Sequence, residues 1–304
     1  MRIGTRGSAL ALAQSAYVRE LLPRGDHPTE VIETTGDRNP DLSFRRIGGK
    51  GVFTKEIELA LLDGRIDLAV HSLKDLPTEE TPGLVIAALL AREDPRDVLI
   101  ARTGKGLADL PPGATVGTSS LRRRSQLLAR RPDLVIQELR GNVPTRIARM
   151  KEGRYDAIVV AAAGLRRLGL TGEIVEILDD AVMLPAPGQG ILAIQTREND
   201  SATNQAVASL NDAAAEAEAA AERGFLAGLG GGCLVPVGAH GIARGGRITL
   251  AGFVGHPDGR PALRSSGEGN AAEAAALGQA LALALLEQGA REILDEVRGK
   301  EVSP

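Results

Sequence analysis

The only cysteine of this sequence lies among glycines. Cys233 occurs in GLGGGCLVPVG, residues 228 to 238, of a 304-residue chain. A single thiol forms no internal disulfide and builds no structural zinc site. Glycines leave space for another group to approach the sulfur, and they let the loop adopt positive φ angles. The alternative is a small buried hydrophobe, as many free cysteines are, and the loop alone does not decide between the two.

A second group of reactive residues occurs in HSLKDLP, residues 71 to 77, where Lys74 and Asp75 are adjacent. The segment follows an apolar run typical of a buried strand, and residues just beyond the carboxyl ends of parallel strands line the cleft of an α/β domain. The alternative is a surface ion pair at a turn. We expect His71 to be a packing residue. The other histidines lack the spacing of metal ligands, so no metal site is predicted.

Two turns between a strand and a helix indicate anion sites. TRGS contains Arg6, and GTSSLRR contains Arg122 and Arg123. Backbone N–H groups at a helix N-terminus attract anions, and the arginine fork donates two parallel hydrogen bonds to a carboxylate. Ordinary helix capping beside solvated arginines is the alternative, but two similar turns, together with Arg140 and Arg146 of LRGNVPTR, favour anion binding.

The charge is unevenly distributed. Between Arg122 and Arg154 there are ten cations and three acidic residues, a net +7 in a chain of net charge −3. A local cationic segment in an acidic protein indicates a polyanionic ligand. Nucleic acid is disfavoured because there is no Trp and there are only two Tyr and four Phe to stack on bases.

Short apolar runs alternate with helical patterns in the first two thirds of the chain, which predicts α/β domains with parallel sheets. IGTRGSALALAQ and VGTSSLRRRSQL share a design of strand, turn, serine cap (Ser8 and Ser120) and helix, which indicates two domains of similar construction. MRIG, VIETT, IDLAV and GLVIAALL are expected strands of the first.

Two segments, 91–102 and 184–197, are expected to cross between these domains. A helix over 211–229, three strands in VPVGAHGIA, RITLAGFVG and RPALRSSGE, and one long helix over 271–297 predict a smaller α+β domain. The polar, glycine-rich segment 36–51 is expected to be a mobile lid. The predicted domains comprise 1–94 with 191–211, then 95–190, then 212–304.

Nine motifs occur in this order along the chain: TRGSALALAQ, GGKGVFTKE, DLAVHSLKDLPT, REDPRDVL, GTSSLRRRSQL, LRGNVPTR, YDAIVVAAAGLRRLGL, LPAPGQG and GGCLVPVG. Taken together, they resemble the porphobilinogen deaminase (hydroxymethylbilane synthase) family over essentially the full length of the chain. The resemblance implies two periplasmic-binding-protein-like (type II) α/β domains and a small C-terminal α+β domain. It also implies that Cys233 holds a dipyrromethane cofactor through a thioether.

The resemblance further implies a transferase that deaminates four porphobilinogen molecules and joins them head to tail on this primer. The product, hydroxymethylbilane, would pass to the next enzyme of tetrapyrrole (haem) biosynthesis. Asp75 would stabilise the pyrrole cation left by ammonia or relay protons, with Lys74 beside it. The acetate and propionate groups would be bound by residues matched through the motifs: Arg6, Ser8, Gln14, Lys50, Phe53, Ser72, Thr118, Ser119, Ser120, Arg122, Arg123, Arg140, Gly141, Arg146, Arg167 and Gln189.

The sequence departs from the family pattern at two positions, which should affect local contacts and not the reaction. Arg46 replaces an expected lysine, and Leu234 replaces a more usual polar residue. A solute-binding protein for a small polycarboxylate is the main competing hypothesis, but it would be exported and would not need Cys233. A DNA-binding regulator leaves HSLKDLP unexplained. Without a signal peptide or an apolar run of membrane-spanning length, we expect a cytoplasmic protein with no membrane or nucleic-acid partner, and a monomer.

Overall fold

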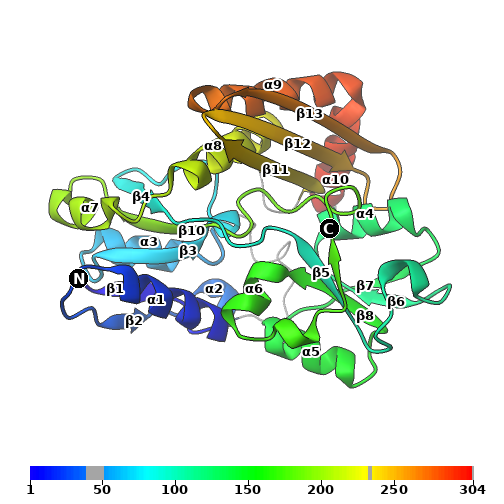
Figure 1. Cartoon of the computed structure of the whole chain (residues 1–304), viewed down its shortest axis with the longest axis horizontal. Coiled ribbons are helices and arrows are strands. Elements are labelled where there is room, and N and C mark those ends of the chain that lie inside the picture. Colours follow the sequence, from blue (N-terminus) through cyan, green and yellow to red (C-terminus); the bar gives the residue numbers. More distant parts are fainter. Residues whose placement is uncertain (39–50, 232–234, 303–304) are drawn as a thin grey trace.

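A computed structural model describes residues 1–38, 51–231 and 235–302 of the chain. Two five-stranded sheets with helices against them form the lower part of the molecule in Figure 1, and a three-stranded sheet with long helices lies above them. This arrangement confirms the predicted fold class of two similar α/β units and a smaller α+β unit. Cys233, Leu234, Arg46 and Lys50 lie outside the described residues.

The first sheet has the strand order β2-β1-β3-β10-β4. Strands β1 and β2 are parallel, as are β1 and β3, whereas β10 runs antiparallel to both of its neighbours. The expectation of parallel sheets is therefore wrong for β10, because this strand returns from the second unit and enters the sheet from the opposite end. Its strands are β1 (Ile3–Thr5), β2 (Thr29–Val31), β3 (Leu68–Ser72), β4 (Leu84–Leu89) and β10 (Leu192–Arg197).

The second sheet repeats this design with the order β7-β6-β8-β5-β9. Strand β6 is parallel to β7 and β8, and the crossing strand β5 is antiparallel to β8 and β9. The predicted similarity of the two units is thus confirmed at the level of strand order and direction. The strands are β5 (Asp97–Ala101), β6 (Thr115–Gly117), β7 (Val135–Gln137), β8 (Ala157–Ala161) and β9 (Glu176–Leu178).

The helices of both units begin where polar caps predict. Ser8 accepts a hydrogen bond from the Ala11 N–H, and Ser120 accepts one from the Arg123 N–H. The strand expected in VIETT lies earlier, since Val31 ends β2 and Thr35 begins a helical turn. The helices are α1 (Ala9–Leu21), α2 (Thr35–Arg38), α3 (Lys55–Leu62), α4 (Leu121–Arg130), α5 (Val143–Lys151), α6 (Ala162–Arg167) and α7 (Ser201–Ala208), with short 3₁₀ turns at Leu73–Asp75, Leu107–Asp109 and Thr171–Glu173.

The third unit is an antiparallel meander against helices. Its strands are β11 (Val237–Arg244), β12 (Arg247–Gly255) and β13 (Ala262–Asn270), as predicted. Helix α8 (Ala213–Gly228) precedes them, and α9 (Ala274–Leu285) and α10 (Arg291–Val302) follow. The single closing helix that was predicted is interrupted, because Gly289 has φ 104°, a left-handed conformation that an α-helix does not contain.

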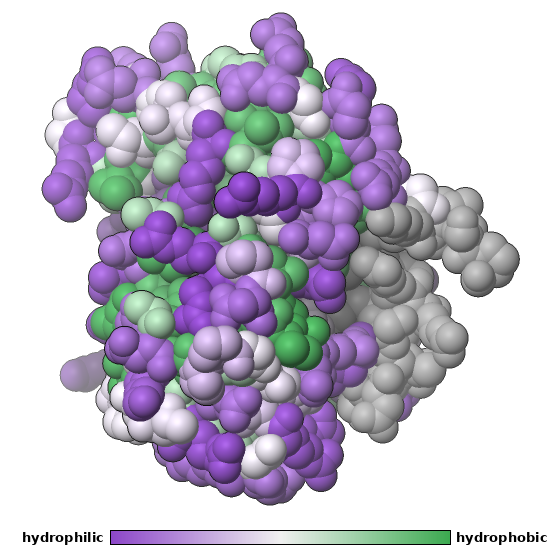
Figure 2. Space-filling model, turned by 90° about the vertical axis from the view of Figure 1, so that its right-hand side faces the viewer, coloured by the Kyte–Doolittle hydropathy of each residue, from purple (hydrophilic) through white to green (hydrophobic). Residues whose placement is uncertain are grey.

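Each unit has its own apolar core. Phe225 lies in the third core, whereas the first two cores consist mainly of Val, Ile, Leu and Ala side chains. The face at the right of Figure 1, turned toward the viewer in Figure 2, is largely hydrophilic with apolar residues between. None of the helices in the described ranges combines the length and the apolar run that a membrane crossing needs.

The domain boundaries stay a prediction. The lid expected over 36–51 begins with α2, and its residues 39–50 are not described.

Candidate active site

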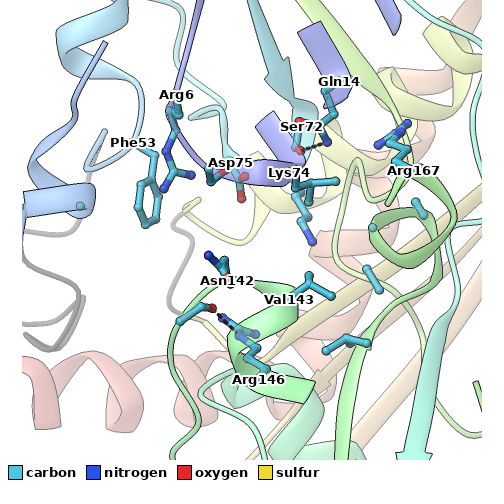
Figure 3. A pocket seen from close by; sticks show the side chains of 18 of the residues that line it. Arg6, Gln14, Phe53, Ser72, Lys74, Asp75, Asn142, Val143, Arg146 and Arg167 are labelled. Atoms are coloured by element: carbon cyan, nitrogen blue, oxygen red, sulfur yellow. Dashed lines mark hydrogen bonds between the residues drawn. The ribbon is translucent and has the colours of Figure 1, made fainter. Parts of the chain in front are cut away.

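A cavity of about 830 Å³ lies between the first two units. Figure 3 shows Arg6, Lys74 and Asp75 on one side of it, and Asn142, Val143 and Arg146 of the second unit on the other, with charged groups turned toward the space between. Of the residues predicted to bind ligand or act in catalysis, thirteen line this cavity: Arg6, Ser8, Gln14, Phe53, Ser72, Lys74, Asp75, Arg123, Arg140, Gly141, Arg146, Arg167 and Gln189.

The first wall is built at the carboxyl ends of β1 and β3. These two strands are parallel neighbours, so the segments that follow them emerge at the same edge of the sheet. Arg6 and Ser8 follow β1, whereas Lys74 and Asp75 follow β3 in a 3₁₀ turn. Gln14 of α1 donates a hydrogen bond of 2.9 Å to Ser72 Oγ, which joins the two segments (Figure 3).

Arg6 is held between a carboxylate and an aromatic ring. Its Nε lies 3.2 Å from Asp37 Oδ2, and its guanidinium carbon lies 3.9 Å from the centre of the Phe53 ring. Burial alone would raise the pKa of Asp37, but hydrogen bonds from Arg6 and Thr34 hold it below its ordinary value. A Cβ at Gly36 would lie 2.2 Å from the Phe53 ring, so glycine is needed there. Sequence reasoning missed Asp37, although GDRN contains it.

The opposite wall crowds positive charges. Arg140 follows β7, and Arg146 of α5 donates through Nε to the Gly141 carbonyl at 2.7 Å. Burial, together with the nearby cations Arg123 and Arg140, lowers the pKa of Arg146 to about 10, and Asp75 opposes the shift. Neighbouring cations destabilise one another's charged forms. An anion bound beside Arg146 would therefore stabilise the charged form of this arginine.

A buried network connects the two walls. Asp97 begins β5 and is fully buried, and its carboxylate accepts hydrogen bonds from Arg122 Nη1 at 2.7 Å and Arg123 Nη2 at 2.8 Å. Gln189 donates to the same carboxylate at 2.9 Å, and its own amide oxygen accepts from Lys74 Nζ at 3.3 Å. Burial opposes ionisation of Asp97, but both arginines hold its pKa far below the ordinary value. Sequence reasoning did not identify Asp97 as their partner.

Lys74 lies at the end of this network, partly exposed to the cavity. Its pKa is lowered to about 8, mainly by burial and also by Arg123 and Arg122, while Asp75 and Asp97 oppose the shift. Lys74 is thus charged at neutral pH but can lose its proton in a mildly alkaline solution. Asp75 beside it is exposed, and it points into the cavity toward the second unit (Figure 3).

Four predicted anion-binding residues do not line the cavity. Arg122 is 4% exposed and donates to Asp97 and to the Leu184 carbonyl, so its charge is used inside the protein. Ser119 donates to the Leu139 carbonyl, Ser120 caps α4, and Thr118 accepts from the Ser120 N–H. The polar side chains of this predicted anion site instead satisfy local backbone groups, and of its two named arginines Arg123 reaches the cavity.

The histidine of HSLKDLP is buried as expected. His71 is 5% exposed, its Nε2 has no hydrogen-bond partner among the described residues, and burial lowers its pKa to about 4. It is therefore neutral at physiological pH. Within the described ranges, no three His, Cys, Asp or Glu side chains are grouped as metal ligands.

Two predicted residues, Cys233 and Lys50, cannot be placed because they are outside the described ranges. The chain that leads to Cys233 can be followed to Gly231. A Cβ built on Gly231 would lie 3.3 Å from Thr78 Oγ1. The end of α8 and the segment after Asp75 therefore lie side by side.

Comparison with known families gives two matches. Residues 1–205 match the model described as "Porphobilinogen deaminase, dipyromethane cofactor binding domain", and residues 217–287 match "Porphobilinogen deaminase, C-terminal domain". The porphobilinogen deaminase of Deinococcus radiodurans is 49% identical over 303 residues, which cover 97% of this chain and 98% of the relative. That of Thermus thermophilus is 50% identical over 302 residues, with 97% and 98% covered.

Similar solved structures are more distant. The VFT2 domain of Bordetella pertussis BvgS aligns with a TM-score of 0.41 and 15% identity over 69% of this chain and 84% of that one. A periplasmic binding protein from Brucella ovis with bound glutathione aligns with a TM-score of 0.40 and 14% identity, over 72% and 68%.

Proposed function

The chain belongs to the porphobilinogen deaminase family, and we propose that its cavity is where porphobilinogen is deaminated and joined, four molecules in turn, into hydroxymethylbilane. Full-length relatives at about half identity carry this activity in their names. The competing hypothesis of a solute-binding protein is not favoured by that assignment.

The main support for the proposal is that Asp75 and the arginines of the second unit lie on opposite sides of one cavity. Porphobilinogen bears an acetate and a propionate, which suit arginine forks. Loss of ammonia from its aminomethyl arm creates positive charge on the pyrrole, which suits a carboxylate. One cavity thus offers partners of the correct sign both for the permanent negative charges and for the transient positive one.

The described residues also fit a dipyrromethane. A cavity of about 830 Å³ falls in the range of small-molecule sites. Arg6, Arg123, Arg140 and Arg146 would hold the four carboxylates of the cofactor. Cys233, matched through GGCLVPVG, would be its point of attachment. When bound, the cofactor supplies the nucleophilic α-carbon to which each new ring is joined.

We assign three tasks to the protein's own groups. Arg146 binds and orients a carboxylate, because burial and the cations beside it disfavour its charge until an anion is bound. Asp75 stabilises the substrate cation: at roughly 4 Å and an effective dielectric constant of about 20, opposite charges attract by about 4 kcal/mol. Lys74, held by Gln189, keeps positive charge beside Asp75 and donates hydrogen bonds to anionic groups.

We extend the proposal to the protein's surroundings. A single cysteine among 304 residues supports a reducing compartment such as the cytoplasm. We propose that the protein acts there as a monomer and releases hydroxymethylbilane to the next enzyme of tetrapyrrole biosynthesis. Sedimentation of the purified protein tests the first point; a dimer at micromolar concentration would contradict it.

The function is tested by two measurements on one preparation. Incubation with porphobilinogen should release ammonia and yield a linear tetrapyrrole, and the intact mass of the resting protein should exceed that of the polypeptide by one dipyrromethane. Porphobilinogen that binds without release of ammonia would instead support a binding protein. A bare polypeptide mass in an active preparation would exclude the role proposed for Cys233.

A further inference from the structure

Helix α8 of the third unit holds the segment that follows Asp75. The guanidinium of Arg223 donates hydrogen bonds to three consecutive carbonyls, those of Leu76, Pro77 and Thr78, at 3.5, 2.8 and 3.3 Å. Three successive carbonyls can converge on one cation only if the backbone bends around it. The path of the chain immediately after Asp75 is therefore set by a side chain of another unit.

The preceding residue of α8 holds the second segment that borders Lys74. Glu222 is fully buried, pairs with Arg92 at 2.6 Å, and accepts a hydrogen bond of 2.6 Å from the Gly188 N–H. The next residue, Gln189, binds Lys74. Two adjacent residues of one helix thus hold the segments on both sides of the Lys74 and Asp75 pair.

The Asp75 side chain is positioned through the backbone around it, where Leu73 and Leu76 are buried. This side chain is exposed, and among the described residues its carboxylate accepts no hydrogen bond. The turn that contains it is a single 3₁₀ turn closed by the Leu76 N–H on the Leu73 carbonyl. The direction of the Asp75 carboxylate therefore depends on how the backbone on both sides of this turn is held.

We propose that Arg223 is a positioning residue for the reaction: by clamping the carbonyls of Leu76 to Thr78, it fixes Asp75 relative to helix α8 and to the segment that leads to Cys233. Arg223 does not line the cavity, so it acts through the backbone and not on the substrate. The inference rests on the proposed function in that Asp75 is taken as the group that faces the reacting pyrrole.

The chain contains a matched control for this clamp. Arg131 donates to the carbonyls of Leu107, Ala108 and Leu110 at 2.7, 3.1 and 2.9 Å. It thus uses the same side chain and the same number of carbonyls, but none of these residues lines the cavity. Loss of Arg131 should free its own segment and leave the pocket in place.

The test compares Arg223→Ala, Arg223→Lys and Arg131→Ala with the unaltered protein, all carrying cofactor as judged by intact mass. Hydrogen exchange of residues 73–79 should accelerate about tenfold in Arg223→Ala. Its kcat should fall about a hundredfold, since small misplacements of a reacting group are costly, whereas KM should change by no more than about threefold. Arg223→Lys should recover part of the kcat, because lysine can reach one carbonyl.

Arg131→Ala should accelerate exchange only near residues 107–110 and keep the normal kcat. Unchanged exchange at 73–79 in Arg223→Ala would overturn the clamp, as would a normal kcat or an equal loss of kcat in Arg131→Ala. Turnover by the unaltered protein reports on the proposed function, whereas hydrogen exchange reports on the clamp without any need for turnover.

Discussion

Asp97 Oδ1 lies 2.8 Å from Arg123 Nη2, which forms a buried ion pair directly behind the cavity. The other carboxylate oxygen of Asp97 binds Arg122 at 2.7 Å. Two guanidinium groups thus share one carboxylate, and the cluster keeps a net positive charge. Because Arg123 also lines the cavity, this excess charge faces the place where we propose that anionic substrate binds.

Replacement of Asp97 by Asn tests how far this pair supports the fold. Removal of one partner leaves buried charges uncompensated, so the free energy of unfolding at pH 7 should fall by about 3–5 kcal/mol, as measured by urea denaturation. The arginines depress the pKa of Asp97 in the folded state. Its contribution to stability is therefore present above the unfolded-state pKa and is lost as the pH falls below it.

Asp133→Asn serves as the control because Asp133 pairs with Arg131 at the surface. Exposed pairs contribute little to stability, so this variant should unfold close to the normal urea concentration. Equal stability losses in the two variants at pH 7 would show that Asp97 does not act as the internal counter-ion.

Replacement of Asp75 by Asn should abolish most turnover without loss of stability. The side chain is exposed, so the melting temperature should stay the same. If its charge acts mainly on the transition state, removal of about 4 kcal/mol lowers the rate by about a thousandfold, as measured by release of ammonia in a single turnover. Asp75→Glu keeps the charge and should retain more activity. Normal ammonia release by Asp75→Asn would exclude the role in cation stabilisation.

We predict that substrate binding weakens at alkaline pH, as Lys74 loses its proton. Its pKa is lowered to about 8, so the protonated fraction falls as the pH rises from 7 to 9, to about a tenth at pH 9. If the ammonium binds substrate carboxylate, KM for porphobilinogen should rise about tenfold over that range. Lys74→Arg keeps its charge there and should flatten the profile. An identical rise of KM in Lys74→Arg would assign the titration to another group.

The cavity could be predicted from sequence to a large extent, whereas the internal partners of its charges could not. Arg6 and Asp75 directly follow apolar strands, and the ends of parallel strands meet at one edge. Arg122 and Arg123 are adjacent, but successive helical residues point about 100° apart. Both arginines bind Asp97, and Arg123 also lines the cavity. The position of Asp97 in the fold could not be predicted from any local sequence pattern.

The direction of the strands could not be predicted from local sequence patterns either. The apolar runs of β5 and β10 look like those of the parallel strands, and a run of Val, Ile and Leu carries no direction. Direction follows from the two crossings between units, which bring each strand into its sheet from the far end. The break at Gly289 could have been suspected, because glycine inside a helical pattern weakens it.

We expect Arg146 to bind substrate but to lower the stability of the free protein. Its replacement should therefore increase stability and decrease the affinity for substrate. Burial and the nearby arginines lower its pKa to about 10, which means that the folded protein disfavours this charge when no anion is bound. Arg146→Leu should therefore raise the free energy of unfolding by about 0.5–2 kcal/mol, as relief of a strained site commonly does.

The same variant should lose affinity for substrate. A charge-assisted hydrogen bond contributes about 1.5–3 kcal/mol, so KM for porphobilinogen should rise by roughly 10- to 150-fold in protein that carries its cofactor by mass. Arg154→Leu is the control, because Arg154 is exposed and pairs with Glu152 away from the cavity; it should change neither quantity. Loss of stability in Arg146→Leu together with a normal KM would mean that this arginine supports the fold and not the substrate.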